Sequence, residues 1–343
     1  MLTIWLDGWF SSAYNIIELL KKNPDKKPIK VITSHYKDMG YKIISDEFYI
    51  RPDFPEKRDD FSYKDWATQF AKEHEIDIFF PRRYYSTLYN AHKDFIFVNR
   101  KTEIQECKLV LPGLFLEERN MFTNLFENKL DIQNSLSSWD INLRKYELPT
   151  EKFTEIADIE RFKKYLDNHN FKYNKLCMKP ISGTGAQGFR ILDYPYDVWK
   201  IRDILERSGQ EFVIMPYLEG EEISIDFLEY NDKIIFVPRK KLKNTRIQEI
   251  CFDDEIIQIC DDIDKSGICH STEVVGNIQF IKHNKKIYLL EVNPRMSGGI
   301  YLDSLAGVNF PYLMVKKILG EEIKIPKIKS CKVVNIERGV RVE

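Results

Sequence analysis

The chain has 343 residues and nearly equal numbers of basic and acidic side chains, 52 lysines and arginines against 53 aspartates and glutamates. This balance gives the whole protein no attraction to nucleic acid or to an anionic membrane, so we expect neither as a partner. A hydrophobic content of 43% and an aromatic content of 13% exclude a disordered chain, and the length indicates two or three domains.

The sequence shows no signal for export, membrane insertion or metal binding by cysteine. No apolar run approaches the about 18–20 residues needed to span a bilayer. The opening MLTIWLDGWF has neither a basic segment nor a cleavage site. The 6 cysteines show no CxxC or Cys/His spacing, which is typical of reduced thiols. We therefore expect a cytoplasmic protein.

The first third of the chain alternates strands and helices, a pattern that predicts an open parallel α/β sheet. The expected elements are the strand 2–6, the helix 13–22, the strand 30–34, the helix 63–74 and the strands 77–81, 95–98 and 108–111. No glycine-rich loop follows the first strand, so a dinucleotide-binding domain is not expected. We place a domain boundary at Pro112-Gly113.

Ligands of such sheets bind beyond the carboxyl ends of the strands. That rule places residues 8–12, His35 and 82–86 on one rim, although each of them can equally be a solvated loop. Beyond the boundary, residues 114–138 are expected to form two helices, and a further helix is expected at 158–169.

A glycine-rich segment lies between two expected strands, 176–180 and 189–193. Gly183, Gly185 and Gly188 match GxGxxG, but a dinucleotide site requires a helix after the glycines. We therefore expect a β-hairpin whose tip lays backbone N–H groups over a phosphate chain. Lys179 would add a point charge for the same phosphates. The alternative is a mobile surface hairpin.

Another expected strand, 211–218, ends in a crossing that could hold an adenine edge between the apolar side chains of Met215, Tyr217 and Leu218. Glu222 would then suit a ribose diol, unless EGEE is only a charged turn. The segment RKKLKNTR, residues 239–246, is either a solvated face or a set of cations for the γ-phosphate or an anionic substrate.

The most informative stretch is KIYLLEVNPRMSGG, residues 286–299, an apolar strand that ends in a turn. Glu291, Asn293 and Arg295 alternate along it and so project from one face. A hairpin would bring Gln279 close to Glu291. Acid and amide oxygens suit Mg²⁺, and the arginine suits phosphate. An ordinary ion pair at a strand end is the alternative.

These motifs together resemble the ATP-grasp superfamily. The resemblance rests on CMKPISGTGAQGFRIL, FVIMPYLEGEEISID and GNIQFIKHNKKIYLLEVNPRMSGG, in that order. The ending NPRMSGG is similar to the carbamoyl-phosphate-synthase-like branch. The segments WLDGWFSSAYNI and IDIFFPRR resemble ATP-grasp proteins associated with tellurite-resistance operons.

The resemblance implies a fold of α/β and α+β parts, with a pre-ATP-grasp α/β domain at 1–112 and an ATP-grasp domain at 113–343. The second domain would contain a lid subdomain at about 150–212 and a C-terminal subdomain at about 213–343, with ATP between them. It also implies the cofactors ATP and Mg²⁺, or Mn²⁺, and a homodimer as one arrangement that similar proteins adopt.

Site residues are implied in the same way. ATP would contact Lys129, Lys179, Ser182, Gly183, Thr184, Gly185, Gly188, Met215, Pro216, Tyr217, Leu218 and Glu222. The metal would be held by Gln279, Glu291 and Asn293, and catalysis would use Lys179 and Arg295. Substrate would meet Trp9, Phe10, Ser11, Arg239, Lys241, Arg246, Ser297 and Gly298. Many family members carry Asp or Glu at the position of Gln279, whereas the carbamoyl-phosphate-synthase-like branch can carry the neutral Gln.

The implied activity is an ATP-dependent carboxylate–amine ligase that activates a small-molecule or peptide carboxylate as an acyl phosphate. Two alternatives stay open: phosphoryl transfer without an amine acceptor, and a nucleotide-binding sensor or scaffold without turnover.

Overall fold

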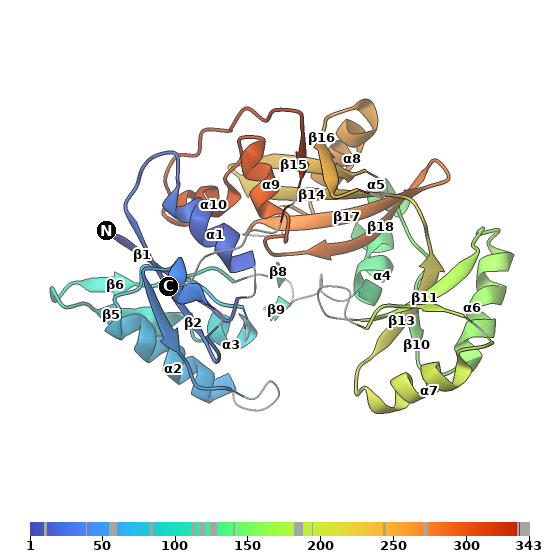
Figure 1. The fold of residues 1–343 in the computed structure, drawn as a ribbon, viewed down its shortest axis with the longest axis horizontal. Helices are drawn as coiled ribbons and strands as arrows, with labels where there is room; N and C mark the ends of the chain where they lie inside the picture. Colours follow the sequence, from blue (N-terminus) through green and yellow to red (C-terminus); the bar gives the residue numbers. More distant parts are fainter. Residues whose placement is uncertain are drawn as a thin grey trace.

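The computed structural model describes residues 1–9, 12–38, 40–54, 60–82, 85–111, 114–116, 121–123, 129–139, 141–181, 188–193, 195–242, 245–269, 274–334 and 336. Most strands of this described part belong to an N-terminal sheet, a lid sheet and a C-terminal sheet. Figure 1 shows the N-terminal and lid sheets at opposite ends of the molecule, with the C-terminal sheet between them. The expected fold class, α/β with α+β, is confirmed.

The N-terminal sheet has the order β3-β2-β1-β4-β7, and every neighbouring pair in it is parallel. Its strands are β1 (Leu2–Asp7), β2 (Ile29–His35), β3 (Glu47–Ile50), β4 (Ile78–Phe80) and β7 (Lys108–Leu109). The connections hold α1 (Ser12–Lys21), η1 (Tyr41–Ile43), α2 (Asp60–Glu73), α3 (Tyr85–Asn90), η2 (His92–Phe95) and the hairpin of β5 (Ile96–Val98) with β6 (Ile104–Glu106). The expected parallel sheet is therefore confirmed. The strand expected at 95–98 does not belong to it, because β5 pairs with β6 in a separate antiparallel hairpin.

The segment after this sheet differs from expectation. Where two helices were expected in 114–138, β8 (Leu114–Leu116) and β9 (Met121–Thr123) form an antiparallel hairpin before α4 (Lys129–Trp139) and α5 (Ile141–Arg144). The prediction of the first of those two helices was wrong. The short runs Leu-Phe-Leu and Met-Phe-Thr contain aromatic and β-branched residues that favour strands.

The lid sheet is antiparallel, in the order β10-β13-β11-β12. It contains β10 (Glu151–Phe153), β11 (Lys175–Pro180), β12 (Arg190–Leu192) and β13 (Phe212–Tyr217), together with the helices α6 (Ala157–Asn168) and α7 (Val198–Arg207). Both helices pack on one face of the sheet through a shared apolar cluster. Because β13 belongs to this sheet, the chain leaves it after Tyr217, whereas the C-terminal subdomain was expected to begin at about 213.

The C-terminal sheet has the order β18-β17-β14-β15-β16-β19, with antiparallel neighbours. It comprises β14 (Glu221–Tyr230), β15 (Lys233–Lys241), β16 (Ile247–Ile250), β17 (Gly276–His283), β18 (Lys286–Asn293) and β19 (Cys331–Val334), with α8 (Asp254–Lys265), α9 (Ile300–Leu305) and α10 (Phe310–Ile318). The turns Asn231-Asp232 and Asn284-Lys285 have positive φ at both residues, as tight two-residue hairpins require.

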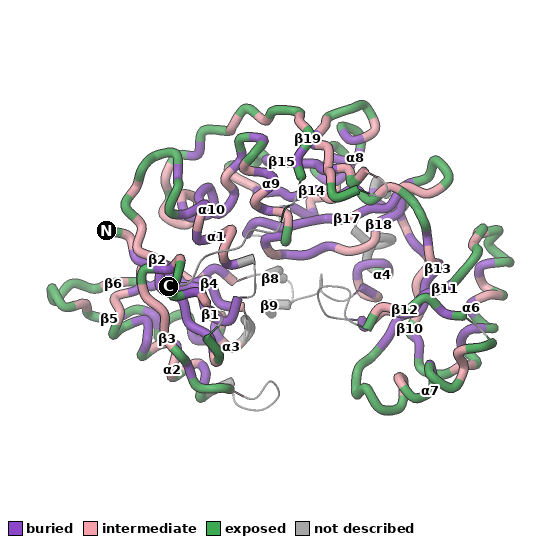
Figure 2. Tube along the Cα trace, viewed as in Figure 1, coloured by how far each residue is buried: buried purple, intermediate pink, exposed green. Residues whose placement is uncertain are grey.

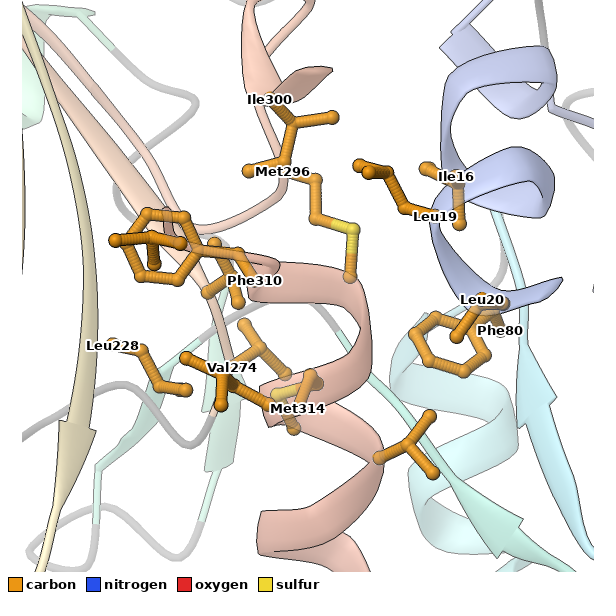
Figure 3. Close-up of a cluster of buried hydrophobic side chains, with 14 of the residues drawn as sticks. Ile16, Leu19, Leu20, Phe80, Leu228, Val274, Met296, Ile300, Phe310 and Met314 are labelled. Atoms are coloured by element: carbon orange, nitrogen blue, oxygen red, sulfur yellow. The ribbon is translucent and has the colours of Figure 1, made fainter. Parts of the chain in front are cut away.

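The N-terminal sheet and the C-terminal part share one hydrophobic core. Figure 3 shows Ile16 and Leu20 of α1 facing Met296, Ile300 and Met314 across this core. Buried area of this kind stabilises by about 25 cal/mol per Å², so the two parts are held together as one packed unit. The stretch just after the NPR motif is thereby fixed against α1 of the N-terminal part.

Figure 2 shows buried residues running along the strands of all three sheets, while much of α7 is exposed. Across the described ranges, no helix combines the length and the apolar character that a membrane crossing would need.

Candidate functional site

One face of the C-terminal sheet is polar over several strands. The strands β14, β17 and β15 run side by side, so alternate residues of each strand share a face. The polar face carries Glu222, Ser224, Asp226, Arg239, Lys241, Asn277, Gln279, Glu291 and Asn293. The intervening residues, such as Ile225, Phe227 and Phe280, are buried in the cluster beneath α8. The sheet thus separates an apolar core from a polar face, on which Asp226, Asn277 and Arg239 are buried.

The residues expected to hold a metal are brought together on this face. The hairpin of β17 and β18 pairs Gln279 directly with Glu291. The Asn293 amide donates to Glu291 Oε1 at 3.0 Å, and Arg295 Nη2 donates to Asn293 Oδ1 at 3.1 Å. Carboxylate and amide oxygens are hard donors, and a set with one carboxylate leaves coordination positions for phosphate and water, as Mg²⁺ prefers. The donor set therefore fits Mg²⁺.

This set is distinct from an all-protein metal cage. Within the described residues, no group of three or more His, Cys, Asp or Glu side chains could hold a metal ion. A metal bound by one carboxylate and two amides would depend on a ligand such as a nucleotide for the rest of its charge.

An apolar cluster borders the polar face, and we call it the hinge cluster. It contains Leu148, Cys177, Ile181, Val213, Met215, Leu218, Ile281 and Tyr288. Ile281 lies two residues beyond Gln279 on β17, so the cluster continues the face that carries the metal ligands. Burial raises the pKa of Cys177 to about 11, so its thiol is a neutral member of the hinge cluster. Two of the residues expected to enclose adenine, Met215 and Leu218, belong to the cluster.

Lys179 lies on the same face of β11 as Cys177, because strand residues two apart point the same way. Its ammonium nitrogen is 5.6 Å from the centre of the Phe189 ring. The amide nitrogen of Lys129, at the start of α4, donates to Ile181 O at 3.0 Å. The two lysines expected at the phosphates are thus held beside the end of β11.

Most of the expected phosphate loop lies outside the described residues: Ser182, Gly183, Thr184 and Gly185. Gly188, at its end, has a φ of +76°, and a Cβ there would lie 2.7 Å from Pro180 Cγ. Only glycine fits this position without strain. The strands β11 and β12 pair on either side of the loop, which confirms the expected β-hairpin.

The crossing from the lid sheet to the C-terminal sheet runs through Pro216, Tyr217 and Leu218. Gly220 then packs directly against β17, where a Cβ would lie 2.0 Å from Lys282 O. Beyond it, Glu222 Oε2 forms an ion pair with Lys241 Nζ at 3.1 Å. These two side chains were expected to meet ribose and substrate respectively, and the structure places them together at one end of the polar face.

Arg239 does not fit its expected role at the substrate. It is 2% exposed, and its guanidinium forms ion pairs with Asp226 and with Asp303, the latter at 2.8 Å. Burial and the charge of Asp226 raise the pKa of Asp303 well above its usual range, against the lowering effect of Arg239. Arg239 is therefore a buried structural cation, which corrects the expectation from the basic run.

The glycine turn after the NPR motif rests on this arginine. A Cβ at Gly299 would lie 2.5 Å from Arg239 Nη1, so the guanidinium occupies the space of a side chain. Ser297 is 6% exposed and its hydroxyl donates to Asp226 Oδ2 at 2.9 Å, so it also faces inward. A Cβ at Gly298 would meet no described atom within 4 Å. Of this turn, the backbone at Gly298 is open to a ligand.

The other expected substrate residues are dispersed. Trp9 is 5% exposed and its indole N–H donates to Phe80 O at 2.9 Å, at the carboxyl ends of the paired strands β1 and β4. It is a packing residue there, which corrects its expected contact with substrate. Phe10 and Ser11 lie outside the described residues. Arg246 is exposed just before β16.

Comparisons with known proteins agree with this architecture. Residues 208–340 match a family described as ATP-grasp in the biosynthetic pathway with Ter operon. N5-carboxyaminoimidazole synthetase from Staphylococcus aureus, complexed with ADP, superposes with a TM-score of 0.71 at 14% identity, covering 98% of this chain and 82% of that one. The chain has the ATP-grasp fold.

Two further similar proteins support this ATP-grasp assignment. The carbamoyl phosphate synthase large chain of Lachnoclostridium phytofermentans is 28% identical over 173 residues, which cover 43% of this chain and 15% of the relative. The chain thus spans only a small part of that relative's length. L-amino acid ligase from Bacillus licheniformis has a TM-score of 0.61 at 15% identity, covering 93% of this chain and 74% of that one. The expected resemblance to the carbamoyl-phosphate-synthase-like and Ter-associated ATP-grasp proteins is confirmed.

Proposed function

We propose that this chain is an ATP-dependent carboxylate–amine ligase that releases ADP and phosphate. The observation that carries the proposal is the polar face on which Gln279, Glu291 and Asn293 lie beside Arg295 and next to the hinge cluster. Oxygen ligands, a phosphate-binding fork and an apolar floor are the parts that a bound nucleotide and metal require.

In this proposal, the hinge cluster and Tyr217 enclose adenine, and Glu222 exchanges its ion pair with Lys241 for the ribose hydroxyls. Lys179 and Lys129 contact the phosphates. Mg²⁺ or Mn²⁺, held by Gln279, Glu291 and Asn293, would supply Lewis-acid stabilisation of phosphate charge. Residues 182–188 are the proposed phosphate loop of the lid.

The proposed reaction begins when a substrate carboxylate attacks the γ-phosphorus of ATP. The bond from this phosphorus to the bridging β-phosphate oxygen breaks, so that ADP leaves and an acyl phosphate forms. Arg295 and Lys179 are positioned cations that stabilise the charge developing on the transferring oxygens. An amine then attacks the acyl phosphate, and phosphate leaves as the amide forms. The open backbone at Gly298 is the proposed contact for the carboxylate substrate, and Lys241 and Arg246 are proposed as further cations for it. The lid would keep water from the intermediate.

The names of similar proteins support this chemistry. The structure with the TM-score of 0.71 is a synthetase complexed with ADP, and the one with 0.61 is an amino acid ligase. We extend these functions to this chain as part of the proposal, together with the expected division into 1–112 and 113–343, a homodimer, and a cytoplasmic location.

The test is Mg²⁺-dependent release of ADP and phosphate with a panel of amino acids, dipeptides and other small acids, each with and without amine acceptors. The proposal predicts release that requires both an acid and an amine, with one amide formed per phosphate. Release with an acid alone would show phosphoryl transfer without an amine and overturn the ligase assignment. Glu291→Gln is the matched negative control. It keeps the shape of the side chain and removes its charge, so this variant should release much less ADP than the wild type.

A further inference from the structure

The metal ligand at position 279 is an amide, and an amide has two different ends. Only the Gln279 oxygen can bind a cation, while its NH₂ group would repel one. A carboxylate at the same place would present oxygen whichever way it turned. This chain must therefore determine how the Gln279 amide is oriented, a requirement that does not arise for Asp or Glu.

A chain of hydrogen bonds runs from Gln279 into the protein. Gln279 Nε2 donates to Asn277 Oδ1 at 3.1 Å. Asn277 Nδ2 in turn donates to Asp226 Oδ1 at 3.0 Å and to Ser224 Oγ at 2.9 Å. Asn277 and Asp226 are both fully buried, so these contacts are not exchanged with water. The three residues are neighbours because β14 and β17 pair Asp226 with Asn277.

The polarity of this chain is set at its buried end. Asp226 accepts hydrogen bonds from the guanidinium of Arg239 and from the hydroxyl of Ser297, the latter at 2.9 Å. A carboxylate between such donors only accepts, so it can face only the NH₂ end of Asn277. The Asn277 oxygen then faces Gln279 and can face only its NH₂ end. The Gln279 oxygen is the group left for the metal.

We propose that Asp226 and Asn277 are positioning residues that turn the Gln279 amide oxygen toward the metal position on the polar face. This inference rests on the proposed function, because it needs a metal at Gln279, Glu291 and Asn293. It adds two residues that act through Gln279 without touching the metal. Arg239 belongs to the same device, since it keeps a positive charge beside Asp226.

The substitution Asp226→Asn tests the polarity directly. Its new amide oxygen would accept from Arg239 and Ser297, so its NH₂ group would face Asn277. Asn277 would then reverse to offer its oxygen, and its NH₂ group would face Gln279. Gln279 would reverse in turn and present NH₂ to the metal. One isosteric change thus inverts the whole chain of hydrogen bonds.

The measurement is Mn²⁺ binding to the full chain with the ATP analogue AMP-PNP, followed by electron paramagnetic resonance, so that no turnover is needed. We expect Asp226→Asn to weaken Mn²⁺ binding by about 10-fold or more, the usual effect of losing the residue that orients a metal ligand. Asp262→Asn is the matched control. Asp262 is also buried and accepts from Tyr146, Lys145 and Gln258, but it lies on α8, away from the polar face. It should leave Mn²⁺ binding unchanged.

Rescue separates orientation from structural damage. The carboxylate that Gln279→Glu introduces has oxygen at both ends, so in this background the reversal of Asn277 no longer affects which atom faces the metal. The reversed Asn277 even offers its NH₂ group as a hydrogen-bond donor to the new carboxylate. We expect Asp226→Asn to cost nothing in Mn²⁺ affinity in that background, or to improve it. Merely structural damage would give the same loss in both backgrounds.

The outcomes are distinct. An equal loss of Mn²⁺ affinity with and without Gln279→Glu, or no loss from Asp226→Asn at all, would overturn the positioning role while leaving the proposed function standing. Failure of the wild-type chain to bind Mn²⁺ with AMP-PNP would overturn the proposed function itself. Loss with Gln279 and none with Glu at 279 is the result that the inference requires.

Discussion

Replacing Arg51 with methionine should destabilise the N-terminal sheet by more than lost packing alone. Arg51 Nε lies 2.9 Å from Asp7 Oδ1, and the two side chains are only 4% and 3% exposed. Asp7 also accepts from Ser34 Oγ at 2.6 Å and from Tyr63 OH at 2.7 Å. The arginine is the cation that offsets a carboxylate buried at the carboxyl end of β1.

The size of the effect follows from that burial. Removing one partner of a buried ion pair costs about 3–5 kcal/mol, because the remaining charge is uncompensated. Burial raises the pKa of Asp7, while Arg51, Ser34 and Tyr63 lower it, and the net shift is upward. Without Arg51 this pKa rises further, so the native state binds a proton more readily.

The sign of the pH dependence is therefore defined. A carboxyl group whose pKa is raised on folding favours the native state below its unfolded pKa, and this advantage is lost as the pH rises through the folded pKa. The loss in Arg51→Met should thus be smaller at about pH 5 than at about pH 8.

Urea unfolding followed by tryptophan fluorescence at both pH values measures this loss. The double variant Asp7→Asn/Arg51→Met is the matched control and should recover most of the lost stability. A loss below about 1 kcal/mol, within the range of ordinary substitutions, or one independent of pH, would refute the reasoning.

Four further substitutions test other parts of the structure. Glu291→Gln and Arg295→Met should each lower turnover by at least about 10²-fold in an ADP-release assay, while leaving the thermal unfolding curve unchanged. Phe310→Ala empties a fully buried position in the core shared with α1 and should cost about 3–5 kcal/mol in urea unfolding. Gly220→Ala places a Cβ against Lys282 O, so we expect a loss of about 1–3 kcal/mol and weaker ATP binding. A Gly220→Ala variant as stable as the wild type would contradict the close approach.

Periodic patterns made much of the fold predictable. The parallel sheet followed from alternating strands and helices, and the hairpin of β11 and β12 followed from a glycine motif without a following helix. The contact of Gln279 with Glu291 followed from a turn between two apolar runs. In each case, a local signal determines which residues are neighbours.

The parts that were missed depend on contacts between distant segments. Arg239 belongs to a run of basic residues in sequence, but its partners Asp226 and Asp303 are brought to it by the sheet and by α9. Asp226 stands alone in the apolar run ISIDFL, and a lone carboxylate there was the available signal of a buried pair. The indole of Trp9 meets Phe80 only after the sheet has formed.

Calorimetric titration of the wild-type chain with ATP, with and without Mg²⁺, tests the central claim most directly, because it needs no knowledge of the carboxylate or the amine. The account predicts ATP binding that tightens when Mg²⁺ is present. It predicts that Glu291→Gln binds ATP with little dependence on Mg²⁺, since that variant lacks the only carboxylate of the proposed metal set. Absence of ATP binding by the wild type, or the same dependence on Mg²⁺ in both proteins, would contradict the assignment of the polar face as the nucleotide and metal site.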